Sequence, residues 1–299
     1  MVPARVADHG AGLQPISRPA MPYLSELVVI DAPTSMAYLT DSHLAKCGAT
    51  AEQAFSAARD NMAATALRTM DQKRSQGAPL IRFIDDGDAY FSSLPLIDGW
   101  LAGMGARLGA RPIAFVTEHT GLLLTVETPN GDGVTMLQKM AEEEWTKAVR
   151  PVSPVPYTVD ADGRVVPYDV PRDHPAWETL RHSRILLALT AYEPQTEHYR
   201  DDFAAEHDPF MAALKGFRSP DGEEYTVATW TEGIVSLLPK VDVITFVKQD
   251  TDIFRIPWGI VSDEVGLTPS EGCHPPRYHV GSWPGPEVIV RMKDRAGTA

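Results

Sequence analysis

Apolar residues recur along this chain with two different spacings, one typical of helices and one typical of strands. From Thr50 to about Gln72 they return every three to four positions, at Phe55 and Met62 among others, as on one face of a helix. Thr50 is followed three residues later by Gln53, which matches a capping box at the start of a helix. This segment therefore predicts an amphipathic helix. Further helices are predicted after Ser92 or Ser93, at residues 136–149 and at residues 194–206.

Short apolar runs between turn-forming residues predict strands, because Gly, Pro, Asp and Ser favour the bends that separate them. One pair, at residues 155–168, surrounds Asp162 and Gly163, which suit a tight hairpin turn. The other predicted strands are residues 27–30 with a partner at 36–39, 80–84, 113–126 as a bent pair, 185–189, 210–217, 225–230, 243–247 and 253–258. Helices in the first half and strands in the second favour an α+β fold, or mixed α/β.

Two stretches of the chain resemble each other and suggest an internal duplication. Residues 113–123 read IAFVTEHTGLL and residues 244–254 read ITFVKQDTDIF, so Ile, Phe, Val and Thr occupy matching positions. An Asp-Gly turn that leads to a tyrosine lies upstream of each stretch. We therefore expect two related α/β lobes in which these segments are equivalent strand pairs, with Phe115 and Phe246 facing the core.

Prolines and glycines indicate where the lobes begin and end. Residues 151–175 hold many prolines, and residues 1–18 lack the continuous apolar core of a secretory signal. These features predict a flexible tail at residues 1–21, one lobe at 22–170, and a second lobe at 178–299 that ends in a proline-rich tail.

Composition argues against several classes of protein. The 299 residues are 43% hydrophobic and carry a net charge of −13, an acidic balance that repels phosphate backbones and anionic lipids. No run of about 18 apolar residues is present, as a membrane span would require. Cys47 and Cys273 form no Cys-x-x-Cys pair, so a reducing compartment is the default. We expect a cytoplasmic protein without nucleic acid or membrane partners. A protein partner is compatible with these features, and the oligomeric state is left open.

Several segments occur in a characteristic order along the first half of the chain. They are an apolar strand ending in Asp31, Tyr38-Leu-Thr-Asp41, a helical segment ending in Asn61, Gly87-Asp-Ala-Tyr-Phe-Ser-Ser93 and Pro112-Ile-Ala-Phe-Val-Thr-Glu-His119. Over roughly residues 26–168 this order resembles the YtpQ family, bacterial proteins of unknown function. The chain departs from the family pattern where Thr117 stands for a proline and Gly121 for an acidic residue. The resemblance implies a fold and a bacterial origin, and no established activity. The second half resembles uncharacterised bacterial proteins.

Acidic residues and one histidine are the candidates for catalysis. Asp85, Asp86 and Asp88 surround a glycine, and three carboxylates can bind Mg²⁺ or Ca²⁺ because hard cations prefer oxygen ligands. The alternative is a polar turn before a helix, where the helix dipole favours negative charge, and the absence of EF-hand spacing favours this alternative. His119 lies in a predicted turn, and imidazole is the side chain that titrates nearest neutrality. We expect Asp88 and His119 to lie too far apart for a direct hydrogen bond.

Metal and cofactor sites are not predicted. Cys273, His274 and His279 are three potential zinc ligands, but a fourth ligand would have to come from a distant residue such as Cys47. The glycines at residues 103–109 lack the spacing of a dinucleotide-binding loop. We therefore expect no metal and no cofactor.

Aromatic residues concentrate in the second half of the chain. Trp230 and Phe254 lie in apolar strand patterns, which places them in the expected core. Arg277, Tyr278 and Trp283 lie in the proline-rich tail and are expected at the surface, as binding anchors of the residue types that dominate interfaces.

Three functions remain compatible with the sequence. The preferred one is a non-enzymatic binding or assembly protein whose two lobes present a partner surface, since no recognisable catalytic motif is present. A hydrolase of unknown substrate would use the acidic cluster and His119 in a groove between the lobes. A small-molecule sensor would bind its ligand between the lobes.

Overall fold

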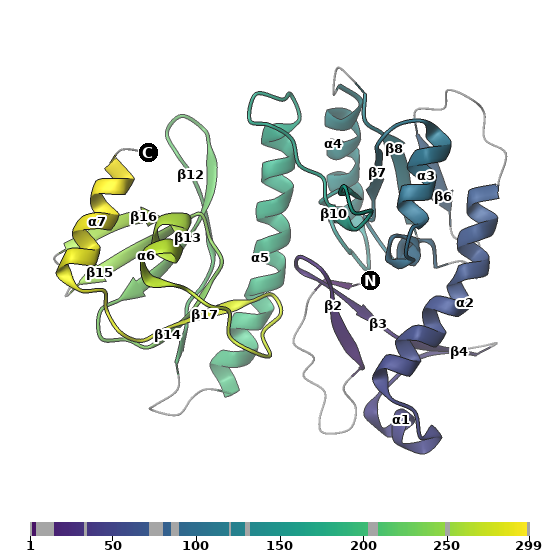
Figure 1. Cartoon of the computed structure of the whole chain (residues 1–299), viewed down its shortest axis with the longest axis horizontal. Coiled ribbons are helices and arrows are strands. Elements are labelled where there is room, and N and C mark those ends of the chain that lie inside the picture. Colours follow the sequence, from purple (N-terminus) through teal and green to yellow (C-terminus); the bar gives the residue numbers. More distant parts are fainter. Residues whose placement is uncertain are drawn as a thin grey trace. The chain divides into compact units, whose positions relative to one another are not determined.

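The chain has an α+β fold with several small sheets, which confirms the predicted class. The structure, a computed structural model, describes residues 2–3, 15–32, 35–71, 80–84, 90–119, 121–128, 132–202, 209–248 and 252–297. Its contacts divide the chain into two units, Met1–Leu187 and Ala188–Ala299 (Figure 1). The division lies beyond the boundary between the expected lobes, which was placed between residues 170 and 178. Among the described residues, no helix has both the length and the apolarity that crossing a membrane requires.

Short β pairs begin the N-terminal unit. β1 (Val2–Pro3), β3 (Leu24–Leu27) and β2 (Ser17–Met21) form a sheet in that order. β4 (Val29–Ala32) and β5 (Ser35–Tyr38) form the hairpin that was expected here. β2 pairs antiparallel with β3, and this pairing corrects the expectation that residues 17–21 belong to a flexible tail.

Two helices follow, α1 (Asp41–Cys47) and α2 (Ala51–Asp71). α2 confirms the helix predicted from its apolar spacing and its capping box. The Gln53 backbone N–H donates to the Thr50 hydroxyl at 3.2 Å, and the Thr50 N–H donates to the Gln53 side chain at 2.8 Å. The cap fixes where the helix starts and therefore which residues occupy each of its faces.

The helix predicted after Ser92 or Ser93 is divided into two pieces. The first is a 3-10 helix, η1 (Phe91–Leu96), and the second is α3 (Trp100–Leu108). Gly99 lies between them with a φ of 74°, a left-handed conformation that glycine adopts without steric cost. The chain therefore turns at Gly99 instead of continuing as one helix.

A five-stranded antiparallel sheet forms the centre of the N-terminal unit. Its strands, in spatial order, are β10 (Val165–Pro167), β9 (Tyr157–Val159), β7 (Pro112–Phe115), β8 (Gly121–Val126) and β6 (Ile81–Ile84). β9 and β10 are the predicted hairpin around Asp162 and Gly163.

Helices cover both faces of this sheet. Ala114 and Leu124 share a core with Met104 of α3, whereas Phe115 and Leu123 belong to a second core with residues of α4 (Asp132–Lys147). Neighbouring residues of a strand point to opposite faces, so the two cores use alternate positions. Figure 1 shows α3 and α4 on either side of β7 and β8. This explains why every residue of β7 is buried.

The helix α5 (Trp177–Asp202) replaces a strand and a shorter helix expected from the sequence. Residues 185–189 were predicted as a strand and residues 194–206 as a helix. Ile185, Leu187 and Ala188 are buried, so the apolar run reflects a buried helix segment, which periodicity cannot distinguish from a buried strand.

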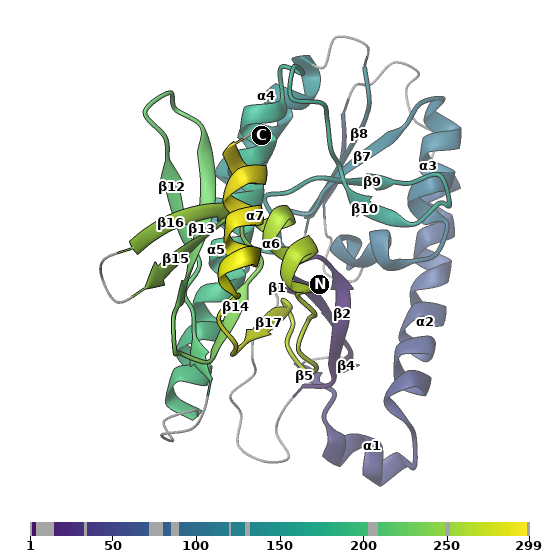
Figure 2. The same cartoon turned by 60° about the vertical axis from the view of Figure 1, so that its left-hand side comes forward.

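The C-terminal unit contains two further sheets. One has the order β11 (Phe210–Met211), β14 (Ser236–Pro239) and β17 (Arg277–Val280). The other has the order β12 (Lys215–Arg218), β13 (Glu224–Thr231), β15 (Val243–Lys248) and β16 (Asp252–Pro257). The helices α6 (Trp258–Val265) and α7 (Pro286–Gly297) contact each other and the second sheet (Figure 2).

The two similar stretches are both antiparallel strand pairs, β7 with β8 and β15 with β16, which confirms that part of the prediction. Phe115 and Phe246 are both buried. Their sheets differ, however, because β7 has an antiparallel neighbour in β9 whereas β15 has a parallel neighbour in β13. The structure shows a recurring hairpin and does not show duplication of a whole lobe.

Candidate functional site

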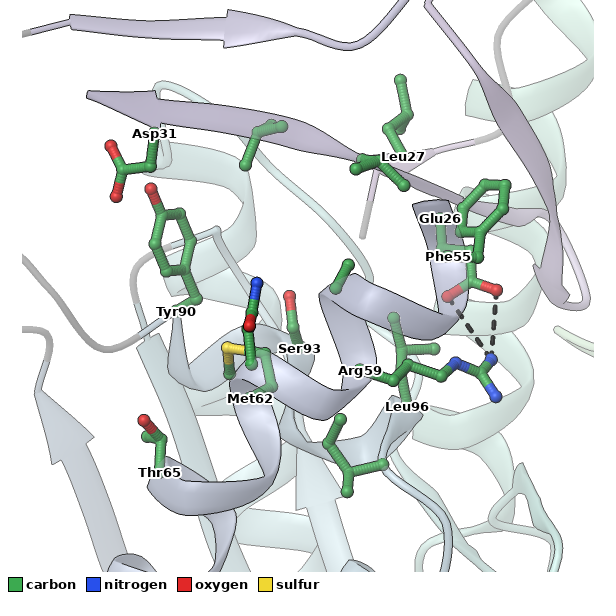
Figure 3. A pocket seen from close by; sticks show the side chains of 15 residues that line it. Glu26, Leu27, Asp31, Phe55, Arg59, Met62, Thr65, Tyr90, Ser93 and Leu96 are labelled. Atoms are coloured by element: carbon green, nitrogen blue, oxygen red, sulfur yellow. Dashed lines mark hydrogen bonds and ion pairs between the residues drawn. The ribbon is translucent and has the colours of Figure 1, made fainter. Parts of the chain in front are cut away.

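A cavity of about 300 Å³ lies in the N-terminal unit. Its walls come from α2, from η1 and from residues of β3 and β4 (Figure 3). α2 contributes Phe55, Ala58, Met62 and Thr65, whose spacing places them along one side of the helix. The helical period visible in the sequence therefore positions one wall of the cavity.

Most of the lining is apolar. Apart from α2, the apolar side chains come from the β strands and from the end of η1, and the principal ones are Leu27, Val28, Val29, Leu96 and Ile97. An apolar concave surface with a few polar groups is the usual composition of a small-molecule site. The arrangement can therefore bind the hydrocarbon part of a ligand.

A network of ion pairs closes one end of the cavity. Glu26 is only 6% exposed, and its carboxylate accepts hydrogen bonds from Arg18 and from Arg59. Figure 3 shows the bond from Arg59, whose Nη2 lies 3.1 Å from the carboxylate. Arg18 also donates to Glu52 at 2.9 Å, and its guanidinium lies 4.1 Å from the centre of the Phe55 ring. A buried carboxylate needs such partners because burial without them is costly. The negative charge of Glu26 is therefore neutralised within the protein.

The other end of the cavity carries Asp31 and Tyr90, and Figure 3 shows the Tyr90 hydroxyl pointing toward Asp31. Asp31 is exposed and makes no side-chain hydrogen bond or ion pair with the described residues. Tyr90 precedes η1 with a φ of 43°, in the left-handed region that costs a non-glycine residue about 1–2 kcal/mol. Strain of this kind concentrates at functional sites, because the surrounding structure must hold the residue in place.

The predicted catalytic carboxylates Asp85, Asp86 and Asp88 lie outside the described residues, so their relation to His119 stays a prediction. His119 follows β7 and is partly exposed, and its backbone carbonyl accepts a hydrogen bond from Ser92 at 2.6 Å. That bond connects the turn to η1. It gives the imidazole of His119 no catalytic role.

The expected surface anchors lie in different surroundings from those predicted. Arg277 is fully buried, which corrects the expectation that it is a surface residue. Tyr278 is half-buried against Trp258, with ring centres 4.7 Å apart. Trp283 packs edge-on against Trp230 and is also half-buried. Packing within the C-terminal unit therefore uses most of the surface that these aromatic rings would offer to a partner.

The potential zinc ligands do not come together. Within the ranges that the structure describes, no three His, Cys, Asp or Glu residues are grouped as a metal site requires. Cys273 and His274 are partly exposed, and His279 is exposed on β17. The expectation that the protein holds no metal stays a prediction, which elemental analysis can test.

Sequence reasoning missed the cavity, although one signal for it was present. Leu24, Glu26 and Val28 are buried whereas Ser25 and Leu27 are partly exposed, so a carboxylate occupies an inward position between two apolar residues. A charged residue at such a position needs a partner. The partner Arg59 lies 33 residues further along the chain, and no pattern in the sequence indicated it.

Comparison with known proteins identifies no relative: no family model matches the chain, and no curated protein or solved structure gives a significant match. The resemblance to the YtpQ family over residues 26–168 therefore stays a prediction.

Proposed function

We propose that this chain is a non-enzymatic binding protein, and that the cavity of its N-terminal unit holds a small molecule. The observation that carries this proposal is the cavity itself, about 300 Å³ in volume and lined mainly by apolar side chains. That volume lies at the lower end of the range of about 300–1,000 Å³ typical of ligand sites. At about 30 Å³ for each water-sized group, it accommodates on the order of ten non-hydrogen atoms.

The lining residues support binding more than catalysis. Among them, as far as the structure describes the chain, there is no histidine and no cysteine. Glu26 accepts hydrogen bonds from two guanidinium groups, so its carboxylate is already occupied by partners within the protein. Ser93 also lines the cavity, but a serine nucleophile needs an adjacent base. The hydrolase alternative depends on Asp85, Asp86 and Asp88, outside the described residues.

The proposal is tested with 2-phenylethanol, a neutral molecule of suitable size. Titration of the full-length protein, followed by amide NMR, should give saturable shifts at residues that line the cavity. We expect an affinity of about 1–10 mM, because each atom of a small ligand contributes only a few tenths of a kcal/mol.

A matched pair of variants on α2 locates the binding. Ala58 lines the cavity and Ala64 is exposed on the same helix. Ala58→Trp should fill the cavity and abolish the shifts, whereas Ala64→Trp should bind 2-phenylethanol as the natural protein does. Equal binding by both variants, or shifts that never saturate, would refute the proposal. Thermal melts of both variants confirm that each is folded.

A further inference from the structure

The two ends of the cavity differ in charge, and this difference selects a class of ligand. The carboxylate of Glu26 is held by Arg18 and Arg59, whereas the carboxylate of Asp31 forms no ion pair with the described residues. We propose, building on the function proposed above, that the ligand is a small amphiphilic cation. Its ammonium group lies at Asp31 and its apolar body lies between α2 and η1.

The register of the β4–β5 hairpin shows what surrounds Asp31. Asp31 lies opposite Met36, and Val29 lies opposite Tyr38. Residues directly opposite each other share a face of a sheet, as do alternate residues of one strand. These four side chains therefore lie on one face, and it is the face of the cavity, because Val29 and Asp31 line it. The Tyr90 hydroxyl lies 3.8 Å from the Met36 sulfur, which agrees with this placement.

This face has the chemistry that recognises an ammonium group. Tyr90 lies next to Asp31 in Figure 3, and Tyr38 is the diagonal neighbour of Asp31 across the hairpin. A cation is attracted to the face of an aromatic ring within about 6 Å, in addition to its attraction to a carboxylate. Tyr38 is 45% exposed and Met36 is 44% exposed, so both are accessible to a ligand. The carboxylate of Asp31 thus has the phenol ring of Tyr90 beside it and a second phenol ring, that of Tyr38, at the diagonal position of the hairpin.

The distribution of charge argues against an anionic ligand. Arg59 is the only lysine or arginine among the described lining residues, and its guanidinium contacts Glu26 and also lies 3.8 Å from Asp98. Glu26 and Asp31 give the same lining two carboxylates. The whole chain carries a net charge of −13, which attracts cations and repels anions at long range.

Three molecules with the same phenylalkyl body test the charge preference on the full-length protein. They are phenethylamine, which is a cation at neutral pH, 2-phenylethanol, which is its neutral isostere, and 3-phenylpropionate, which is an anion. We expect phenethylamine to bind about tenfold more tightly than 2-phenylethanol, from an exposed ion pair together with a cation–π contact. We expect 3-phenylpropionate to bind more weakly than either.

Variants assign the preference to individual side chains. Asp31→Asn should reduce the preference for phenethylamine over 2-phenylethanol from about tenfold to about threefold, because the ion pair is lost and the cation–π contact remains. Asp98→Asn is the matched control, because it removes a nearby carboxylate that does not line the cavity. Tyr38→Phe should keep the preference for phenethylamine, whereas Tyr38→Leu should reduce it about threefold because the ring is lost.

The possible outcomes separate this inference from the proposed function. Binding of 2-phenylethanol without any preference for phenethylamine, or a preference that Asp31→Asn does not reduce, overturns the cation inference and leaves the cavity as a binding site. Tightest binding of 3-phenylpropionate overturns it as well. If none of the three molecules binds in the cavity, the proposed function fails together with the inference.

Discussion

Arg277 is a buried residue whose hydrogen bonds connect several segments of the C-terminal unit. Its guanidinium donates to the Gln195 side chain at 2.6 Å, to the Ala212 carbonyl at 2.7 Å and to the Thr196 hydroxyl at 2.6 Å. These acceptors belong to α5 and to the chain after β11, while Arg277 itself begins β17. Arginine suits this position because its planar group carries five donors in fixed directions.

Arg277→Met should destabilise the protein by about 3 kcal/mol or more, because several buried acceptors then lose their donor. Arg277→Lys should also be destabilising, since three donors on a flexible stem cannot reach acceptors in all these directions. Chemical denaturation measures both effects. Hydrogen exchange of β14 and β17 should accelerate in both variants.

The control for these substitutions is Arg255→Met on β16. Arg255 is exposed, and its bond to the Tyr225 hydroxyl is long, at 3.5 Å. A surface change of this kind should alter stability by less than about 0.5 kcal/mol. Equal losses of stability in the Arg277 and Arg255 variants would show that the buried bonds contribute little.

At the scale of elements, α6 and α7 are joined by a group of ion pairs. Arg295 donates to Glu264 at 2.9 Å and to Asp263 at 2.9 Å, and Arg291 donates to Glu264 at 3.0 Å. Arg291 and Arg295 lie four residues apart, so they share one face of α7. The hydrogen bond from Arg295, followed by that from Arg291, lowers the pKa of Glu264.

Glu264→Gln should therefore lower the melting temperature at pH 7. Because the pKa of Glu264 is lowered in the folded protein, its carboxylate contributes to stability above the pKa of about 4.3 of an unfolded glutamate. This contribution to stability is lost as the pH falls through the pKa of Glu264 in the folded protein. The difference in melting temperature between the natural protein and the variant should shrink below about pH 4. Glu271→Gln is the control, because Glu271 is exposed and forms no ion pair within the described chain. A difference that is constant with pH would contradict the assignment.

Elements differed in how well the sequence predicted them, for reasons visible in particular residues. α2 was predicted because its cap at Thr50 and Gln53 and its apolar period are both local signals. The middle of α5 was misread because a helix buried on several sides loses its polar face. The candidate site was missed because Glu26 and Arg59 meet only through the tertiary fold. Local sequence patterns thus predicted the helix and the strands that form the walls of the cavity, but did not predict that these elements pack around a common space.

At the scale of the whole molecule, the two units use the same local element in different sheets. The β7–β8 and β15–β16 pairs both place a buried phenylalanine on the first strand. Each of these pairs requires apolar residues at the positions that face a core, so similar sequences can arise from that requirement alone. The likeness between residues 113–123 and 244–254 is therefore explained without duplication of a lobe.

The parallel pairing of β13 with β15 also has a consequence for the rate of folding. The β12–β13 and β15–β16 pairs are hairpins that close short loops, whereas β13 reaches β15 only after residues 232–242, which include β14. Hairpins with short loops form within microseconds. Strands that are further apart in the sequence pair later, because bringing them together costs more conformational entropy of the connecting chain. Each hairpin should therefore be largely formed at the transition state.

Two substitutions separate these steps in stopped-flow experiments. Phe254→Ala, which removes the ring stacked on Phe246 within the β15–β16 hairpin, should mainly slow refolding. Trp230→Phe, at the residue that lies opposite Phe246 in the parallel pair and outside the β12–β13 pairing, should mainly accelerate unfolding. The reverse pattern would mean that the parallel register nucleates the sheet. With the expected pattern, pairing of β13 with β15 across the connection through β14 is the rate-limiting step in folding of the C-terminal unit. Until that pairing forms, β13 and β15 each keep an open edge to which another chain can add.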